Sequence, residues 1–300
     1  YKQAKNYFKF TEAQQRKLTK KFAIALASKN HRAANIWLAK VSNTDLTDNL
    51  VQGRLAAVLK QQDWLLIKVA LDQLPLSIHK SRQWQYWYAR SLIATNELIK
   101  GEKILNDLAL QRHYYGFLAA SYLEKAVNIQ NKPLVFSVQE KQQLLENSAA
   151  KRAFEFFYLK RFTLARREWS YWLSQLTDRE KLIAAKIAND KGWFDRSIFT
   201  LAQQGYLDDV ALRFPTAFKQ EITYQAKKNA LDPSWIFAIA RRESSFMSDA
   251  HSPAGALGLM QILPSTAKSL LHKKNMSKRY LFNVKNNIKL GSKYLKLLLA

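Results

Sequence analysis

Glu243 is the side chain whose position in the sequence best suits it to catalysis. It lies near the end of a predicted helix that begins at Asp232 and Pro233, because aspartate is a favoured N-cap and proline fits the first helical position. A turn that contains two glycines follows at residues 252–261. A helix that presents one carboxyl group beside such a turn is suited to general acid–base catalysis.

The apolar pattern of this helix predicts that the Glu243 side chain is partly buried. Ile236, Ile239 and Ala240 lie seven, four and three residues before it, so all four residues share one face. A buried carboxylate loses hydration, which favours the neutral form that a general acid needs. The plainer alternative for a helical glutamate is an ion pair with a neighbour. The two preceding arginines are expected to point away.

The turn after this helix carries groups that suit a carbohydrate. Gly255 and Gly258 allow a left-handed backbone or the close approach of a ligand. Ser252 and Gln261 offer a hydroxyl and an amide, which hydrogen-bond well to sugar hydroxyl and acetamido groups. The segment therefore indicates acid-catalysed cleavage of a sugar chain.

The composition indicates a globular protein with an anionic partner. The 300-residue chain has a formal net charge of +25 and 48% hydrophobic residues, enough for a substantial core. Such a charge suits nucleic acid, a membrane surface or an acidic polymer, although a solvated surface explains many of the scattered basic residues. The absence of cysteine excludes disulfides and thiol catalysis. No apolar run approaches the roughly 20 residues that span a bilayer.

Residues 1–214 are predicted to form an α-solenoid of helical hairpins. Short polar turns separate apolar, alanine-rich stretches with a period of about 32–34 residues, which is typical of helical repeats. Pro215 disfavours helix at the residue before it, so we expect a domain boundary there, with a linker and a second, partial domain in residues 215–300. The expected turns lie at residues 29–31, 61–63, 95–97, 128–133, 160–162 and 191–193.

The motif segments together resemble the soluble lytic transglycosylases of bacterial cell-wall turnover. The likeness covers roughly residues 232–298 and is specific in combination rather than in any single piece. The hairpins resemble the curved or ring-like scaffold of that family's long form, by architecture alone. The resemblance implies an all-α fold, an α-solenoid followed by a partial lysozyme-like domain. The matching segments are Glu243-Ser244, Ser252-Pro253, Gly255-Ala256, Gly258-Leu259-Met260-Gln261, Pro264, Asn287-Ile288, Gly291 and Tyr294-Leu295.

The resemblance also implies the chemistry. Glu243 would be the sole acid/base: it would protonate the bond between N-acetylmuramic acid and N-acetylglucosamine, and the muramic C6 hydroxyl would close a 1,6-anhydro ring. Ser252 and Gln261 match sugar-contacting positions, and Leu263 matches an apolar wall. Ordinary glycosidases use two carboxylates; residues 221–300 hold only four acidic residues, of which Asp249 is the plausible second acid.

The chain departs from the family pattern in several places. Phe246 is followed by Met247-Ser248 rather than by Asn-Pro or Asp-Pro, and Asn283-Val284 stands where the family has Asp-Pro; both changes affect turns more than chemistry. The final apolar segment has no helix-ending residue, so we expect the chain to stop inside a domain, before the family's Ala-Tyr-Asn segment. We therefore expect this stretch alone to be inactive or weakly active.

Three other functions remain open at this point. A lysozyme-type hydrolase would use the same glutamate, a scaffold would bind glycan without cutting it, and a helical repeat protein would bind nucleic acid through its charge and aromatic residues. The aromatic residues fit either packing between hairpins or a stacking surface. The histidines lack metal-ligand spacing, so no metal or cofactor is expected. Peptidoglycan strands are the expected partner, nucleic acid is not, and the resemblance implies the periplasm.

Overall fold

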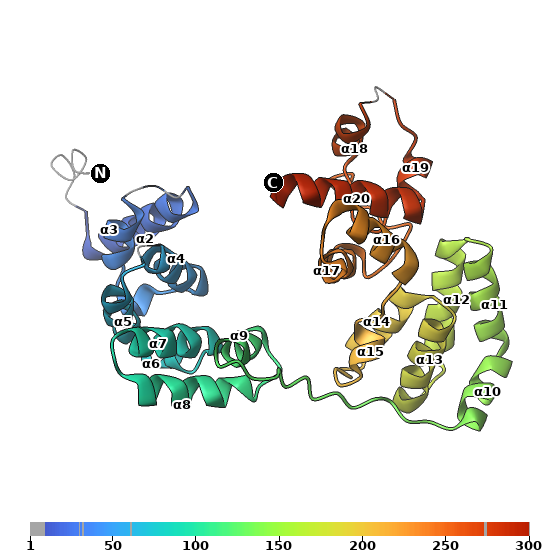
Figure 1. Cartoon of the computed structure of the whole chain (residues 1–300), viewed down its shortest axis with the longest axis horizontal. Coiled ribbons are helices and arrows are strands. Elements are labelled where there is room, and N and C mark those ends of the chain that lie inside the picture. The colour runs from blue at the N-terminus through green and yellow to red at the C-terminus, as the bar shows by residue number, and fades with distance from the viewer. Residues whose placement is uncertain (1–9, 30, 32, 61, 273–274, 300) are drawn as a thin grey trace. The chain divides into compact units, whose positions relative to one another are not determined.

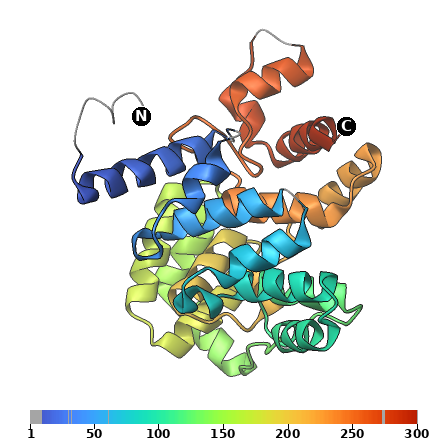
Figure 2. The ribbon, with the colours of Figure 1, turned by 90° about the vertical axis from the view of Figure 1, so that its left-hand side faces the viewer.

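The computed structural model describes residues 10–29, 31, 33–60, 62–272 and 275–299. The predicted all-α class is confirmed: this part of the chain forms helices joined by turns, and neither ribbon view contains a strand (Figures 1 and 2). Two isolated β-bridges occur at residues 251–262. The chain divides into two compact units, residues 1–130 (unit 1) and 131–300 (unit 2). Across the described residues, no helix has the length and apolarity needed to cross a membrane.

Unit 1 is built from successive helices that pack against their neighbours in the chain. Contacts join α2 with α3, α7 with α8, and α8 with α9, as expected for stacked hairpins. Small cores fill the spaces between them. The helices are α2 (Glu12–Ser28), α3 (Ala34–Ala39), η1 (Asn43–Asp45), α4 (Asp48–Leu59), α5 (Trp64–Asp72), α6 (Leu76–His79), α7 (Arg82–Ala94), α8 (Leu98–Ala109) and α9 (Tyr114–Tyr122).

Unit 2 continues with two further hairpins and then a more irregular helical group. Helix α11 packs on α12 and α13 on α14, whereas α16, α17, α18 and α19 all contact the last helix, α20. Its helices are α10 (Val138–Glu146), α11 (Ser148–Tyr158), α12 (Phe162–Ser174), α13 (Asp178–Asp190), α14 (Phe194–Gln203), α15 (Val210–Arg213), α16 (Lys219–Asn229), α17 (Pro233–Ser244), α18 (Pro264–Leu271), α19 (Lys278–Phe282) and α20 (Val284–Leu299).

The predicted hairpin turns coincide with breaks between helices. Among the residues with left-handed backbone, five recur at intervals of 34, 34, 30 and 32 residues. A left-handed residue just after a helix lets the amides that follow the helix bond to the free carbonyls of its last turn, which ends the helix. The repeat of left-handed residues therefore has a direct structural cause. Within the predicted turns, Asn30 and Gln61 lie outside the described residues. The five recurring residues are Gln62, Asn96, Gln130, Lys160 and Gly192.

The turn predicted at residues 128–133 is part of a longer connection. No helix occupies residues 123–137, which join α9 to α10 (Figure 1). Beyond residue 130 this segment is attached to the connection between α14 and α15 and to the start of α15 through three backbone amides. Lys132 N donates to the carbonyl of Asp208 at 2.9 Å, and Leu134 N donates to the Asp209 carboxylate at 2.9 Å. Val210 N donates to the side-chain oxygen of Asn131 at 3.0 Å.

Most large aromatic side chains of unit 2 serve packing. Trp169, Trp172 and Trp193 are at most 2% exposed, and their rings meet edge to face with Phe154 at centroid distances of 6.0–6.2 Å. Such pairs stabilise a core beyond the area they bury. Packing therefore accounts for these rings, whereas Tyr171 is 56% exposed.

The boundary predicted at Pro215 lies within unit 2. Helix α15 ends at Arg213, directly before it, and α16 starts at Lys219. The described helices on both sides belong to one compact unit, so a division into residues 1–214 and 215–300 stays a prediction.

The ion pair between α10 and α13 makes a pH-dependent contribution to stability. Glu140 accepts a hydrogen bond from Arg179 Nε at 2.8 Å and another from the backbone of Ser137, which lower its pKa from 4.5 to about 2. Because the pKa is lower in the folded state, this stabilisation is present above pH 4.5 and is lost as the pH falls toward 2.

We predict that Glu140→Gln lowers the melting temperature at neutral pH and that this deficit shrinks in acid. Glutamine still completes the capping box with Ser137, so the change removes mainly the charge pair. Thermal unfolding followed by circular dichroism from about pH 7 to about pH 3 checks this. Glu146→Gln, an exposed glutamate of the same helix, is the control. A deficit that stays constant over the range would contradict the prediction.

Candidate active site

Helix α17 starts as its sequence predicts, and its end is strained. Asp232 accepts a hydrogen bond from Ser234 N at 2.8 Å, and Pro233 occupies the first turn. Ser245 and Phe246 then both adopt left-handed backbone, with φ of 52° and 65°. Each such residue costs about 1–2 kcal/mol without a glycine. Burial of the Phe246 ring, 4% exposed, helps to offset this cost. The helix therefore ends at Ser244, one residue after Glu243.

The predicted burial of Glu243 is wrong. Its side chain is exposed, because the buried stripe of α17 runs through Ile236, Ala240 and Ser244. Glu243 lies at the edge of that stripe, about 60° around the helix from its centre at Ala240 and in the last turn of α17. Arg241 makes its contacts elsewhere: Nε donates to the Arg213 carbonyl at 2.8 Å. Among the described residues the Glu243 carboxylate has no hydrogen-bond or ion-pair partner.

Ser244 connects the helix to the glycine-containing turn. This residue is 7% exposed, and its hydroxyl donates to the carbonyl of Leu259 at 2.7 Å. The turn itself is closed by paired backbone bonds between Leu257 and Ile262, each 3.1 Å long. The buried serine therefore holds the end of the Glu243 helix against the turn.

Asn287 fastens the same turn from the opposite side. This fully buried side chain of α20 accepts a hydrogen bond from Met260 N at 2.7 Å. Its amide donates to the carbonyls of Leu257 and Leu281 at 2.9 and 2.7 Å. Met260 N and the Leu281 carbonyl have no other hydrogen-bond partner among the described residues, whereas the Leu257 carbonyl also accepts from Ile262 N. One asparagine thus satisfies backbone groups that the turn leaves unpaired.

Two glycines of the motif are required by this packing. Gly258 has φ of 74°, and a β-carbon there would lie 2.4 Å from both the Asn287 amide nitrogen and the Leu281 carbonyl. A β-carbon on Gly291 would lie 2.3 Å from the sulfur of Met260. The Gly258 segment and the Asn287–Gly291 segment are distant in sequence but pack directly against each other.

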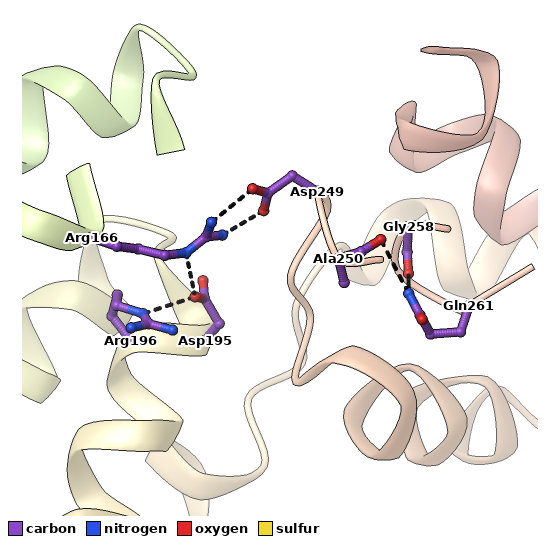
Figure 3. Close-up of polar contacts among 7 residues, drawn as sticks. All are labelled: Arg166, Asp195, Arg196, Asp249, Ala250, Gly258 and Gln261. Carbon is purple, nitrogen blue, oxygen red and sulfur yellow. Dashed lines mark hydrogen bonds and ion pairs between the residues drawn. The ribbon is translucent and has the colours of Figure 1, made fainter. Parts of the chain in front are cut away.

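The predicted sugar-contacting residues lie on the loop between α17 and α18. The Ser252 hydroxyl accepts a hydrogen bond from Ala256 N at 3.1 Å, so it also shapes the loop. Gln261 donates both amide hydrogens to carbonyls, those of Ala250 at 3.2 Å and Gly258 at 2.8 Å (Figure 3). Its carbonyl oxygen is the group that remains for a ligand. Leu263 is 40% exposed directly before α18.

The acidic residues around Glu243 have structural partners. Asp232 caps α17, and Glu221 accepts a hydrogen bond from Gln225 at 2.9 Å. Asp249 forms a two-pronged pair with Arg166 (Figure 3). No cluster of three metal-ligating side chains occurs within the described ranges. The arrangement thus presents one exposed carboxyl group without a structural partner.

Sequence reasoning missed the residues that hold the site together. Ser244 and Asn287 lie in the motif segments, but the sequence indicates no role for either of them or for Arg166. A buried serine directly after the acid and an asparagine on an apolar helix face are weak local signals, since their partners lie 15 and 27 residues away. Arg166 lies 83 residues from Asp249 and has no local signal at all.

We predict that Asn287→Ala lowers the free energy of unfolding by about 3 kcal/mol, because it leaves two backbone groups, Met260 N and the Leu281 carbonyl, without partners and removes one bond to the Leu257 carbonyl. Urea unfolding followed by circular dichroism measures the change. Asn286→Ala is the matched control: that half-buried neighbour makes one long contact, 3.4 Å, to Tyr280. Equal losses for the two variants would show that the buried hydrogen bonds are not the cause.

Two known protein families match separate regions of the chain. The family described as "Transglycosylase SLT domain" matches residues 220–300, and the "Soluble lytic murein transglycosylase L domain" matches residues 143–210. These two regions are called the SLT region and the L region below. The first contains α16–α20 with Glu243, and the second contains α11–α14 with parts of α10 and α15.

Individual relatives agree with both matches. A Haemophilus influenzae protein assigned to the soluble lytic murein transglycosylases is 29% identical over 252 residues, covering 83% of this chain and 41% of the relative. The soluble lytic murein transglycosylase of Salmonella typhimurium is 27% identical over 253 residues, covering 82% and 39%. The chain thus spans about two fifths of the curated relatives it matches.

A solved structure shares the fold over nearly the whole chain. It is the X-ray structure of an inactive glutamate-to-glutamine mutant of lytic transglycosylase Slt from Pseudomonas aeruginosa, 32% identical with a TM-score of 0.79. The alignment covers 97% of this chain and 48% of that one. By its two matched regions, its relatives and its fold, the chain belongs to the soluble lytic murein transglycosylase family.

Proposed function

We propose that the protein containing this chain cleaves the β-1,4 bond between N-acetylmuramic acid and N-acetylglucosamine in peptidoglycan and leaves 1,6-anhydromuramoyl ends. The observation that carries the proposal is Glu243, exposed and unpaired at the end of a helix that Ser244 fastens to the sugar-suited loop. The SLT region, which surrounds this residue, supports it. In the Pseudomonas relative a glutamate-to-glutamine change is described as inactivating, which supports a glutamate in the central role.

One carboxyl group suffices for both proton transfers of this reaction. Glu243 in its neutral form gives a proton to the glycosidic oxygen as the bond from C1 breaks, and the N-acetylglucosamine side leaves with a free 4-hydroxyl. The resulting carboxylate then takes the proton of the muramic C6 hydroxyl, whose oxygen bonds to C1. The acid is regenerated and no water is consumed, so the single Glu243 carboxyl group acts first as acid and then as base.

The partners of the other acids favour this route over hydrolysis by two carboxylates. A glycosidase that activates water needs a second carboxylate across the bond. Asp249, the second acid considered from the sequence, is bound by Arg166 through both oxygens, at 2.8 and 2.5 Å. An attacking hydroxyl supplied by the substrate removes the need for that second carboxylate.

We further propose roles for the residues around the acid. Gln261 accepts a hydrogen bond from the glycan through its carbonyl oxygen, Ser252 donates its hydroxyl hydrogen, and the exposed Leu263 packs on a sugar ring. The basic surface of the chain, with a formal charge of +25, attracts the carboxylates of peptidoglycan strands. The functional boundary falls between residues 210 and 220, supported by the ends of the two matched regions. The proposed site of action is the periplasm.

Glu243→Gln is predicted to abolish cleavage by the full-length protein, at least about a 1,000-fold loss, because glutamine cannot transfer the proton. Purified peptidoglycan is incubated with each protein, and the released fragments are weighed by mass spectrometry. Fragments one water lighter than hydrolysis products are expected from the wild type. Glu146→Gln, an exposed glutamate outside the site, should leave the products unchanged.

Three outcomes would overturn parts of this proposal. Hydrated fragments would identify a lysozyme-type hydrolase. Undiminished cleavage by the Glu243→Gln variant would assign the acid elsewhere. Binding of glycan by the folded wild-type protein without release of fragments would identify a scaffold.

A further inference from the structure

The L region contacts the loop that follows Glu243 through a charged pair. Arg166 of α12 reaches Asp249, and the guanidinium donates from both terminal nitrogens to the two carboxylate oxygens, at 2.8 and 2.5 Å (Figure 3). The two side chains are only 24% and 27% exposed. A bidentate, half-buried pair fixes the orientation of both partners, unlike a mobile surface ion pair.

A second carboxylate lies at ion-pair distance from Arg166. Asp195 of α14 is 5% exposed; its Oδ2 lies 3.9 Å from Arg166 Nε and accepts a hydrogen bond from Arg196 Nε at 2.9 Å (Figure 3). Burial raises the pKa of Asp195, while the charges of Arg196 and Arg166 oppose that rise. The arginine therefore projects from a prepared position in the L region rather than from a flexible surface.

An apolar contact lies beside the charged one. The Phe194 ring of α14 meets the rings of Phe218 and Phe246 edge to face, at 6.0 and 6.3 Å between centroids. Ile198 of the same helix is 3% exposed within the core of the SLT region. The strained residue Phe246 and the charged residue Asp249 are thus both held by the L region, at two points of one loop.

The loop passes this restraint on to the residues proposed to bind sugar. Asp249 precedes Ala250, whose carbonyl accepts hydrogen bonds from Gly258 N at 2.8 Å and from the Gln261 amide at 3.2 Å. Fixing Asp249 therefore fixes the carbonyl that orients Gln261 (Figure 3). A shift of about 1 Å in such a group is enough to impair an active site.

We propose that Arg166 is a positioning residue of the active site: by holding Asp249, this L-region arginine sets the loop that presents Gln261 to the glycan. The proposal rests on the proposed function for its consequence in catalysis. It assigns a part in glycan binding to a residue outside the SLT region, 77 residues before Glu243 in the sequence. The SLT region then depends on the L region for its binding geometry and not only for its stability.

The first test measures the loop directly. Hydrogen–deuterium exchange is followed for the peptides covering residues 246–262 in the wild type, Arg166→Met and Arg167→Met. Methionine keeps most of the arginine stem and removes the charge, and Arg167 is an exposed neighbour on the same helix. We expect at least about tenfold faster exchange at the amide of residue 258 in Arg166→Met alone, with α13 unchanged. Faster exchange throughout the protein, or no acceleration at residue 258, would overturn the proposal.

A double-mutant cycle separates Asp249 from Asp195 as the partner that matters. If Arg166 acts through Asp249, then Asp249→Asn accelerates loop exchange to a similar degree, and the Arg166→Met/Asp249→Asn double variant adds little to either change. If the acceleration in the double variant equals the product of the two single accelerations, Arg166 acts through Asp195 or through general stability. That result would contradict the proposal.

Kinetics with soluble, uncrosslinked glycan strands tests the consequence in the full-length protein. We expect Arg166→Met to raise KM about tenfold with kcat within about twofold, because a misplaced loop weakens binding. Partial unfolding would instead lower the apparent kcat at constant KM, which overturns the positioning role. A wild-type protein that leaves glycan intact would contradict the proposed function, whereas the exchange data would still decide whether Arg166 fixes the loop.

Discussion

The candidate site depends on one buried hydrogen-bonded junction. Ser244 and Asn287, from two helices, bind three backbone groups of the turn at residues 257–260. The turn pairs Leu257 with Ile262 through its own backbone, but this leaves Met260 N and the Leu259 carbonyl without a backbone partner. Buried backbone groups without hydrogen bonds destabilise a fold. Side chains must therefore supply the partners. The Asn287 amide can reach the turn only because residue 258 is a glycine, since a β-carbon there would lie 2.4 Å from the amide nitrogen.

The junction explains how an exposed acid can still be held in place. Glu243 itself makes no contact that orients it, yet the residue after it is buried and hydrogen-bonded, and the next two residues adopt strained left-handed backbone. Strain of this kind persists only where the surroundings over-determine the conformation. Here the core of the SLT region below the helix and the L region beside it supply that constraint.

The hairpins and the SLT region obey different rules. In the hairpins each helix packs mainly on its neighbours in the chain, and caps and left-handed turn residues recur at regular intervals. In the SLT region the last helix collects contacts from four earlier ones, so its geometry is set by residues far apart in sequence. Local rules govern the first kind of structure well, and long-range packing governs the second.

The sequence by itself determined the helices, their caps, the hairpin turns and the motif around Glu243, because capping, periodicity and turn chemistry act within a few residues. It did not determine that Glu243 is exposed: two of the three apolar residues on its face, Ile236 and Ala240, are buried, but the buried stripe continues to Ser244 and leaves Glu243 at its exposed edge. Nor did it pair Arg166 with Asp249. Which helix face is covered, and which distant charges meet, is decided only when separate elements pack together.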